Sequence, residues 1–557
     1  MAVTGHPLTV QVAARVLEAG GNAVDAGVAA GLATNVVQVD MCNLAGIAPI
    51  LVHEAGSAEV MSVAGVGRWS QTATLEAYSA RHGTAMDPGG GPCIVPGALA
   101  GWLSALDRFG TWSFADVAAP AIELANEGFV LDATVATALD LFAWVYEQWP
   151  SSAALYCPRG RRARAGDRLV QSDLGRLLER LVEAERGAGN GSASQGGAGA
   201  GRRAGIDAVR RAFYEGDVAR TIVDFVTAQG GFLTLGDLAG FRAEVAPAPA
   251  RRLAARDGVT VHVTPARWSQ GPALLQALAI LEHFDLASQE HNSAAYLHLV
   301  LEAVKLAFSD RERHYGDAGS VALDDLLADD HAARLAGMIR PDAVLGDLLT
   351  PRHPADGVVS TTHVAVVDAQ GTAFAAAPSD TLAMGPVVPG LGIVVSGRGV
   401  QSRTDPGHPA ALGPGRRPRV TPSPAIALGA DGVVWPITCP GGDVIVQAML
   451  QAFLNVSVFG MTDQQAVEAP RAVSFASPNS FYPHGHDTAM VAAESRIPAD
   501  ALADLARLGH DVRLWPPYEF EAGSVGMIRR WPGDAHGARP VLRAGADPRR
   551  AAYALGR

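Results

Sequence analysis

The chain has 557 residues, of which 48% are hydrophobic and 18% are charged, a composition typical of a globular protein with a sizeable core. The formal net charge is −12 and no long basic run occurs. These features argue against nucleic acid and against an anionic membrane surface as partners. Lys305 is the only lysine, so catalysis by a lysine side chain could use no other residue.

Cysteine usage and the N-terminus indicate the compartment. Cys42, Cys93, Cys157 and Cys439 form no Cys-x-x-Cys pair, so they predict neither a zinc site nor a redox motif nor a disulfide framework. The N-terminus lacks a basic region followed by an apolar core, and no apolar run reaches membrane-spanning length. We therefore expect a cytoplasmic protein without metal or cofactor.

The spacing of apolar residues predicts helices over most of the first 230 residues. A helix over 9–19 ends at Gly20-Gly21, and an Ala-rich helix begins at Asn22. Apolar runs at 36–39 and 47–52 predict two buried strands. Further helices are predicted over 95–110, 115–127, 134–147, 172–186, 206–213 and 217–228.

The middle of the chain contains two stretches that we expect to be loops. Residues 187–201, within a segment that ends at about residue 205, are rich in Gly, Ala and Ser and predict a flexible surface loop. A strand over 259–263 and helices over 271–283 and 293–314 follow. The chain then becomes loop-like from about Gly316 to Val359.

Two hairpins dominate the last third of the chain. The first joins a strand starting at Val364 to a second strand over 372–377, and the second joins 425–428 to 433–438. A long helix over 444–459, a helix near 499–508 and terminal strands complete the chain. Helices followed by antiparallel strands predict an α+β fold with sheets between helices.

Thr361 and Thr362 stand at the entrance of the first hairpin, where a threonine is most often only a β-former. Glycines 441 and 442 lie between a strand and a helix, where their N–H groups could bind an oxyanion, although a tight turn capped by Asp443 is the simpler interpretation. No Walker loop, Gly-x-Ser-x-Gly elbow or His-Glu-x-x-His pair occurs, and we expect His363 to be structural. A hydroxyl nucleophile without a side-chain base could use its own α-amine, whose pKa is about 8, if the chain were cut before Thr361.

With these features in place, the sequence resembles the γ-glutamyltransferases, which are N-terminal-nucleophile (Ntn) hydrolases. The resemblance covers nearly the whole chain and rests on an ordered set of short motifs. In chain order these are Gly20–Ala26; Val95-Pro96-Gly97 with Ala100-Gly101; Pro120-Ala121-Ile122 with Leu124-Ala125 and Gly128-Phe129; Phe213-Tyr214 with Gly216; Gly230-Gly231 with Leu235 and Asp237-Leu238; Glu302-Ala303 and Lys305; Ala307-Phe308, Asp310-Arg311 and Gly316-Asp317; Thr361-Thr362-His363; Arg417-Pro418; Ser423-Pro424; and Pro440-Gly441-Gly442.

The resemblance implies a four-layer αββα sandwich and self-cleavage between Ser360 and Thr361. Residues 1–360 would then form a large subunit and 361–557 a small one, joined as a heterodimer that acts on a small molecule. Thr361 would be the nucleophile and Ser379 the supporting hydroxyl. Gly441 and Gly442 would form the oxyanion hole. No cofactor is implied.

The substrate clamp departs from the family pattern. The family's Arg position matches Leu75, its Asn matches Thr381, its acid falls near Gln401, and its paired serines read Val420-Thr421. The glycine cluster of the early loop is replaced by residues 43–47. Loss of the acid removes a charge-assisted contact to an ammonium group, so we do not expect free glutathione to be the natural substrate. Arg68, Arg398, Arg417 and Arg419 are candidates for binding an anionic substrate, and Arg417 also belongs to a structural motif.

Three functions remain open from the sequence. The first is a hydrolase or acyltransferase that acts on an amide, γ-glutamyl-like bond through an ester on Thr361. The second, suggested by the altered clamp and the absent export signal, is a hydrolase of a carbon–carbon bond next to a keto group, as in family members that make 4-alkylproline units of antibiotics. The third is an uncut, inactive homologue that acts as a binding protein.

Overall fold

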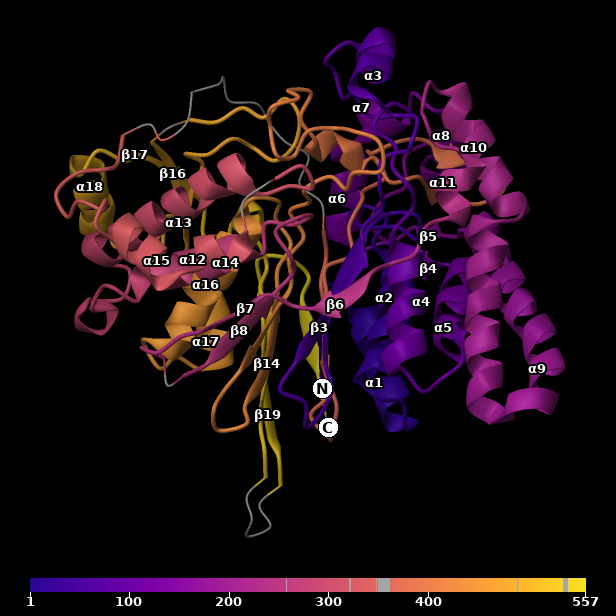
Figure 1. The fold of residues 1–557 in the computed structure, drawn as a ribbon, viewed down its shortest axis with the longest axis horizontal. Coiled ribbons are helices and arrows are strands. Elements are labelled where there is room, and N and C mark those ends of the chain that lie inside the picture. Colours follow the sequence, from indigo (N-terminus) through magenta and orange to yellow (C-terminus); the bar gives the residue numbers. More distant parts are fainter. Residues whose placement is uncertain are drawn as a thin grey trace.

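Two antiparallel sheets face each other at the centre of the molecule, as Figure 1 shows for the computed structural model. The structure describes residues 1–256, 258–319, 322–346, 348, 361–487, 489–533 and 539–556, with backbone only at 159 and 189–198. The first sheet has seven strands, in the spatial order β20 (Tyr553–Leu555), β1 (Ala2–Thr4), β9 (Val364–Val367), β10 (Ala373–Ala376), β2 (Ala48–His53), β3 (Val60–Gly65) and β6 (Val245–Pro247). The second has six, in the order β19 (Val541–Ala546), β18 (Gly526–Trp531), β14 (Val434–Thr438), β13 (Ala425–Leu428), β8 (Thr260–Val263) and β7 (Ala250–Arg252).

The outer face of each sheet is covered by helices. Helices α1 (Pro7–Glu18), α2 (Ala23–Val37), α4 (Ala98–Phe109), α5 (Phe114–Glu127) and α9 (Ser172–Tyr214) build the layer next to the first sheet. Helices α12 (Pro272–Leu281), α13 (Ala294–His314), α16 (Val444–Ser457) and α17 (Asp463–Glu468) build the layer next to the second. The remaining helices of ordinary length include α10 (Asp217–Ala228), α15 (Asp329–Ala336) and α18 (Ala499–Arg507).

Small apolar side chains separate the two sheets. Ala365, Val367 and Ala375 of the first sheet pack with Ile426 and Ile528 of the second, and all five are fully buried. Alternate residues of a strand point to opposite faces, so the neighbouring residues of these strands face the helices instead. The order of layers is therefore helix, sheet, sheet, helix, which confirms the predicted α+β class and the αββα sandwich.

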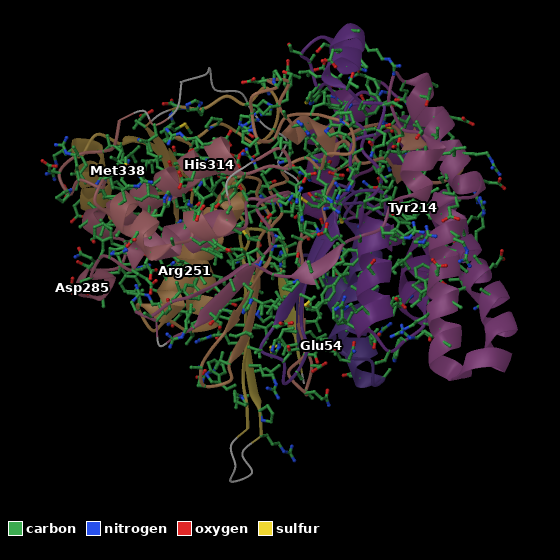
Figure 2. All side chains as sticks on the ribbon, viewed as in Figure 1. Glu54, Tyr214, Arg251, Asp285, His314 and Met338 are labelled. Carbon is green, nitrogen blue, oxygen red and sulfur yellow. The ribbon has the colours of Figure 1, made fainter. Side chains whose placement is uncertain are left out.

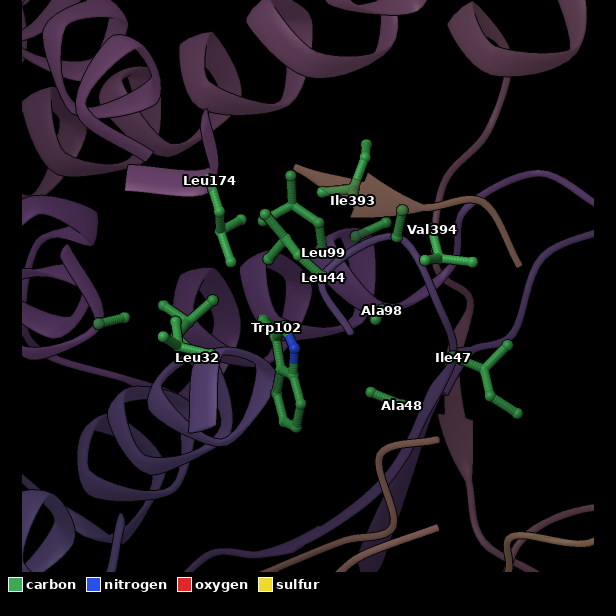
Figure 3. Close-up of a cluster of buried hydrophobic side chains, with 14 of the residues drawn as sticks. Leu32, Leu44, Ile47, Ala48, Ala98, Leu99, Trp102, Leu174, Ile393 and Val394 are labelled. Atoms are coloured by element: carbon green, nitrogen blue, oxygen red, sulfur yellow. The ribbon is translucent and has the colours of Figure 1, made fainter. Parts of the chain in front are cut away.

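Close packing of the first helical layer depends on small residues in α2. Trp102 of α4 lies against this helix, and a Cβ atom at Gly31 would come within 2.7 Å of its ring (Figure 3). The same ring stacks on Phe374 of β10 with centroids 6.3 Å apart. Tyr214, labelled in Figure 2, is also fully buried and donates a hydrogen bond to the Pro96 carbonyl. The small residues of α2 thus let the helix approach the strands that carry the candidate site.

Two predictions about local structure were wrong. Val36 and Val37 do not start a strand but end α2, because the Ala-rich helix continues to them. The expected loop at 187–205 has helical backbone and lies within α9. A Cβ atom at Gly205 would lie 2.8 Å from Glu185 Cγ, so the chain turns back between these two residues. Glycine disfavours a helix, so the composition of this segment does not explain its helical backbone.

The other elements agree with the sequence to within a few residues, with one further difference. Helices α14 (Leu323–Leu326) and α15 interrupt the stretch that was expected to be loop-like after Gly316. The rest of that stretch falls largely outside the described residues. Among the described residues, no helix combines the length and the apolar character needed to cross a membrane.

Candidate active site

Thr361 lies three residues before β9, a central strand of the first sheet. Its side chain is completely buried, and its hydroxyl oxygen is 2.8 Å from that of Ser379. Ser379 follows β10, the neighbouring strand, and an isolated bridge to Ile47 holds its backbone. In that bridge Ser379 N–H donates to the Ile47 carbonyl over 2.9 Å. Two adjacent strands therefore bring together the two hydroxyl groups that the sequence predicted to be catalytic.

The backbone is strained on both sides of this hydroxyl pair. Thr361 has a φ of 128° and Asp380 a φ of 95°. Positive φ values are unfavourable for residues with a Cβ atom, most of all for a β-branched residue such as threonine. Strain of this kind gathers at functional sites, where the surrounding structure enforces it.

Arg398 connects Ser379 to a buried polar network. It lies in the short 3-10 helix η3 (Arg398–Gln401) and is 0% exposed. Its guanidinium donates to Ser379 Oγ and to the carboxylate of Asp380, and over 3.1 Å to Gln401 Oε1. Burial lowers the pKa of Arg398, and the Asp380 charge opposes that shift. A cation with a partner carboxylate thus stands directly behind the hydroxyl pair.

Asp380 belongs to the candidate site, although the sequence did not single it out. It accepts hydrogen bonds from Arg398 and from Ser396 Oγ, and its own carbonyl accepts one from Asn43 Nδ2 over 3.0 Å. The signal was present, because an acidic residue directly follows Ser379. Asn43 belongs to the loop that replaces the family's glycine cluster, so this departure has a structural role.

A chain of hydrogen bonds continues from Arg398 to the glycine pair. Gln401 donates from Nε2 to Thr421 Oγ1 over 3.3 Å. The Gln270 side-chain amide donates to the carbonyls of both Thr421 and Gly442, each over 3.1 Å. The predicted residues Arg398, Gln401, Thr421 and Gly442 therefore share one buried network.

Gly441 and Gly442 have backbone conformations that favour glycine, with φ values of 137° and 63°. Within the described part of the chain, neither N–H group has an acceptor. Both remain available to a ligand at the start of α16. Asp443 does not cap this helix as expected. Instead its carboxylate binds Arg311 and accepts from Ser480 N–H over 2.7 Å, so it anchors the turn.

The residues beside Thr361 are polar but do not supply a base. Thr362 donates from its hydroxyl to Gln38 Oε1 over 2.7 Å. His363 is 1% exposed, and burial lowers its pKa to about 4. Its two ring nitrogens have no hydrogen-bond partner among the described residues. A buried histidine with a lowered pKa and no hydrogen bond to Thr361 is consistent with the structural role predicted for it.

The other predicted substrate-binding residues are engaged locally. Arg68 donates to the Gly415 carbonyl over 2.9 Å and lies 3.4 Å from Asp317. Thr381 Oγ1 accepts from Ala383 N–H in its own turn. Arg417 and Arg419 pair with Glu244 and Glu312, respectively. None of these contacts reaches Thr361, and Ser360 lies outside the described residues.

One group in the described part of the chain has the composition of a metal site. His298, Glu302 and His510 are buried, and their ligand atoms lie within 4.8 Å of one another. His298 Nδ1 is 2.9 Å from His510 Nε2, and the Glu302 carboxylate accepts from Leu345 N–H. Lys305 lies nearby and its charge disfavours a cation. Hydrogen bonding accounts for this cluster, which joins α13 to the turn before β17 (Asp511–Trp515).

Comparison with known proteins identifies the family. The model of the gamma-glutamyltranspeptidase family matches residues 9–556. The Acylase ACY 1 proenzyme of Pseudomonas sp. (strain SE83) is 32% identical, over 85% of this chain and 82% of the acylase. The glutathione hydrolase proenzyme of Bacillus subtilis (strain 168) is 28% identical, over 95% of this chain and 87% of that protein.

Solved structures agree with this assignment. The structure named LmbA2991HD has a TM-score of 0.88 at 32% identity, covering 100% of this chain and 98% of the other. The cephalosporin acylase of Bacillus halodurans has a TM-score of 0.81 at 26% identity, covering 99% and 94%. The chain is therefore an enzyme of the gamma-glutamyltranspeptidase family, with the Ntn-hydrolase fold.

Proposed function

We propose that this protein cuts itself between Ser360 and Thr361 and then acts as a threonine-dependent hydrolase or acyltransferase on an amide bond. The single observation that carries this proposal is the 2.8 Å contact between the buried hydroxyls of Thr361 and Ser379, backed by Arg398. In the uncut chain, Thr361 Oγ attacks the carbonyl carbon of Ser360. The peptide bond becomes an ester, which water hydrolyses to leave Thr361 with a free amine.

Strain at Thr361 supports the first step. A threonine with a φ of 128° stores free energy on the order of 1–3 kcal/mol. Cleavage of the bond before Thr361 removes the constraint on that dihedral angle. The strain therefore lowers the barrier to leaving the uncut state.

Turnover uses the same groups. The freed Thr361 amine accepts the proton of its own hydroxyl, and Oγ attacks the carbonyl carbon of the substrate amide. Gly441 and Gly442 present N–H groups that stabilise the developing oxyanion. The amine part leaves with a proton, and an acyl ester remains on Thr361 until water or another acceptor releases it.

The substrate clamp favours an acyl group without a free ammonium. Among the described residues, the carboxylate beside the hydroxyl pair is that of Asp380, which pairs with Arg398, and Gln401 and Thr421 are uncharged. Polar groups in this network can hydrogen-bond a substrate, but none offers a free negative charge to a cation. Arg398, Gln401, Thr381 and Thr421 are our proposed substrate-binding residues. Arg68 remains a weaker candidate because its guanidinium binds Gly415 and Asp317.

Hydrolysis of a carbon–carbon bond next to a ketone is a second candidate. The lack of a free carboxylate among these substrate-binding residues also favours this reaction. A ketone substrate needs a nucleophile and an oxyanion hole, but it does not need an acidic residue that binds an ammonium group. Amide hydrolysis remains the first choice, since the relatives named acylase and glutathione hydrolase share this fold.

A denaturing gel followed by N-terminal sequencing tests self-cleavage. Wild type should give two fragments, and the smaller one should begin with Thr361. Thr361→Ala should give a single band, whereas the matched control Thr362→Ala, which removes the neighbouring hydroxyl, should still be cut. An uncut wild type whose only N-terminus is Met1 or Ala2 would refute the proposal and favour a binding protein.

The two reactions differ in the species that they leave on Thr361. Cleaved enzyme should be incubated with γ-glutamyl-p-nitroanilide and, in parallel, with candidate ketones, and the small fragment weighed by mass spectrometry. Release of p-nitroaniline with an added glutamyl mass supports the amide reaction. A mass gain from ketones alone supports carbon–carbon cleavage.

A further inference from the structure

A second polar pocket adjoins Thr361 on a side that the network of Arg398 does not use. It is small and partly open to solvent, and its lining includes Gln38, Thr361, Thr362, His363, Pro440 and Arg550. None of the substrate-binding residues proposed above lines it. The pocket therefore reaches the nucleophile by a separate route.

Arg550 lines this pocket, and its guanidinium is only partly hydrogen-bonded. Its Cζ atom lies 4.0 Å from the ring centroid of Phe520, and its Nε donates to the Phe520 carbonyl over 3.1 Å. The two terminal nitrogens are buried and have no partner among the described residues. The adjacent Arg549, by contrast, directs its terminal nitrogens at Glu494 and Asp547. Phe520 thus sets the orientation of the Arg550 side chain, whereas the two terminal nitrogens of its guanidinium donate no hydrogen bond to the described residues.

The charge of Arg550 is only partly balanced by the chain. Asp40 is 1% exposed, and both of its carboxylate oxygens lack a partner among the described residues. Burial raises the pKa of Asp40 to about 7, and the Arg550 charge opposes this shift, so this carboxyl is a weaker acid than an exposed aspartate. Asp132, also on the pocket wall, is used elsewhere, because it caps α6 (Ala133–Leu141) and lies 3.6 Å from His6 Nε2.

We propose that Arg550 binds the carboxylate of a small acid in this pocket, next to Thr361. A guanidinium fork pairs with a carboxylate through two parallel hydrogen bonds, and buried guanidinium groups are stabilised by such a partner. The volume suits a molecule of a few heavy atoms rather than a peptide. If the function proposed above holds, this acid is an acyl acceptor or a released product. That role rests on the proposed function, whereas the binding itself does not.

Calorimetric titration tests the pocket without any knowledge of the substrate. Acetate, glycine and glycinamide should be titrated at pH 6, where Asp40 is mostly neutral, into wild type and into Thr361→Ala. Acetate and glycine should bind saturably to both proteins, and glycinamide, which lacks a carboxylate, should not. Tighter binding of glycine than of acetate would identify an amino-acid acceptor, and equal binding would identify a free acid.

Variants of the arginine locate the binding. Arg550→Gln should weaken acetate at least tenfold, and Arg550→Lys should retain part of the affinity, which guards against a variant that fails to fold. Arg543→Gln is the matched control, since Arg543 is exposed on β19 and lies 5.2 Å from the Trp531 ring centroid. Equal binding by wild type and Arg550→Gln, or no saturable binding of acetate or glycine by wild type, overturns the proposal. Because the uncut Thr361→Ala chain is included, failure of self-cleavage is seen separately on the gel.

Discussion

At the scale of single residues, the charge pair of Arg398 and Asp380 gives a direct test of the site, because both side chains are 0% exposed. Asp380→Ala removes the buried carboxylate that pairs with the Arg398 guanidinium, and breaking a buried pair in this way costs about 3–5 kcal/mol. We expect the urea midpoint of unfolding to fall accordingly. The double variant Asp380→Ala/Arg398→Met should recover most of that loss, since no charge is then buried. An unchanged midpoint in Asp380→Ala would contradict the pairing.

Arg398 also has a kinetic role that can be separated from stability. Its guanidinium donates to Ser379, and Ser379 in turn contacts Thr361, so Arg398 orients the hydroxyl pair. Arg398→Lys keeps a charge but loses the fork, and we expect self-cleavage of freshly synthesised chain to slow at least tenfold. The time course is read from the two bands on a denaturing gel. Arg68→Gln, the control, should leave that rate unchanged.

Single residues also mark the limit of prediction from sequence. Thr361 and Ser379 are recognised because a motif surrounds each of them, and the structure puts their hydroxyls in contact. The role of Asp380 cannot be recognised from the sequence, because its contacts are with Ser396 and Arg398, which lie 16 or more positions later in the chain. Which partner a buried charge finds is decided by tertiary packing, and local pattern carries no information about it.

At the scale of elements, the motif around Asn22 serves to start α2. Asp25 and Asn22 form a capping box, and the Asp25 carboxylate also accepts from the N–H groups of Thr111 and Trp112 over 2.8 and 3.0 Å. Asp368, at the end of β9, accepts from Ala23 N–H over 3.0 Å. These bonds tie the helix to the hairpin that carries the candidate nucleophile.

Asp25→Ala should therefore destabilise the whole protein. Three partly buried N–H donors, those of Asn22, Thr111 and Trp112, would lose their acceptor, each at a cost of about 1 kcal/mol, so we expect a loss of roughly 3 kcal/mol. The control is Asp116→Ala, which breaks the exposed capping box of α5 and should cost only about 1 kcal/mol. Thermal unfolding of the two variants, measured side by side, decides this; equal shifts would argue against the importance of the bonds from Asp25 to Thr111 and Trp112.

Elements were predictable where the pattern was local and long. Both hairpins and the helices of the outer layers follow from apolar spacing, and their order in the chain implied the class. The glycine-rich segment before Gly205 was expected to be a loop because glycine disfavours a helix, and its local pattern contains no reason for the helical backbone that it has. The turn between Glu185 and Gly205 could not be foreseen, since it depends on contacts with α4 and α5 such as that of Glu185 with the Phe114 N–H.

At the scale of the whole molecule, the two proposed fragments share both sheets. In the first sheet, β1 of the large fragment lies between β20 and β9 of the small one, and β10 pairs with β2. Separation would break these ladders and open the core between the sheets. We expect cleaved protein to elute in gel filtration as one species that contains both fragments, and to separate only in denaturant. Fragments that part in buffer alone would contradict this.

Buried histidines predict an acid-sensitive fold. Burial lowers the pKa of His484 to about 3. It lowers the pKa of four other histidines to about 4: His6, His262, His363 and His510. The unfolded chain binds protons at these sites from about pH 6.5 downward and the folded chain does not, so stability falls as pH drops from 6.5 to 4. Asp40, Glu185 and Glu302, whose pKa values burial raises, contribute with the opposite sign but are fewer than these histidines. Unfolding temperatures that stay level between pH 7 and pH 4 would contradict this reading.

Because β1 and β20 are neighbouring strands, the chain could be rearranged so that the proposed self-cleavage is not needed. Ala2 pairs with Leu555, and Figure 1 shows the two ends of the chain close together. A short linker could join them in a circularly permuted gene that starts at codon 361. After removal of the initiator methionine, such a polypeptide would be born with its reactive amine exposed, so catalytic competence would arise at translation and without any scission.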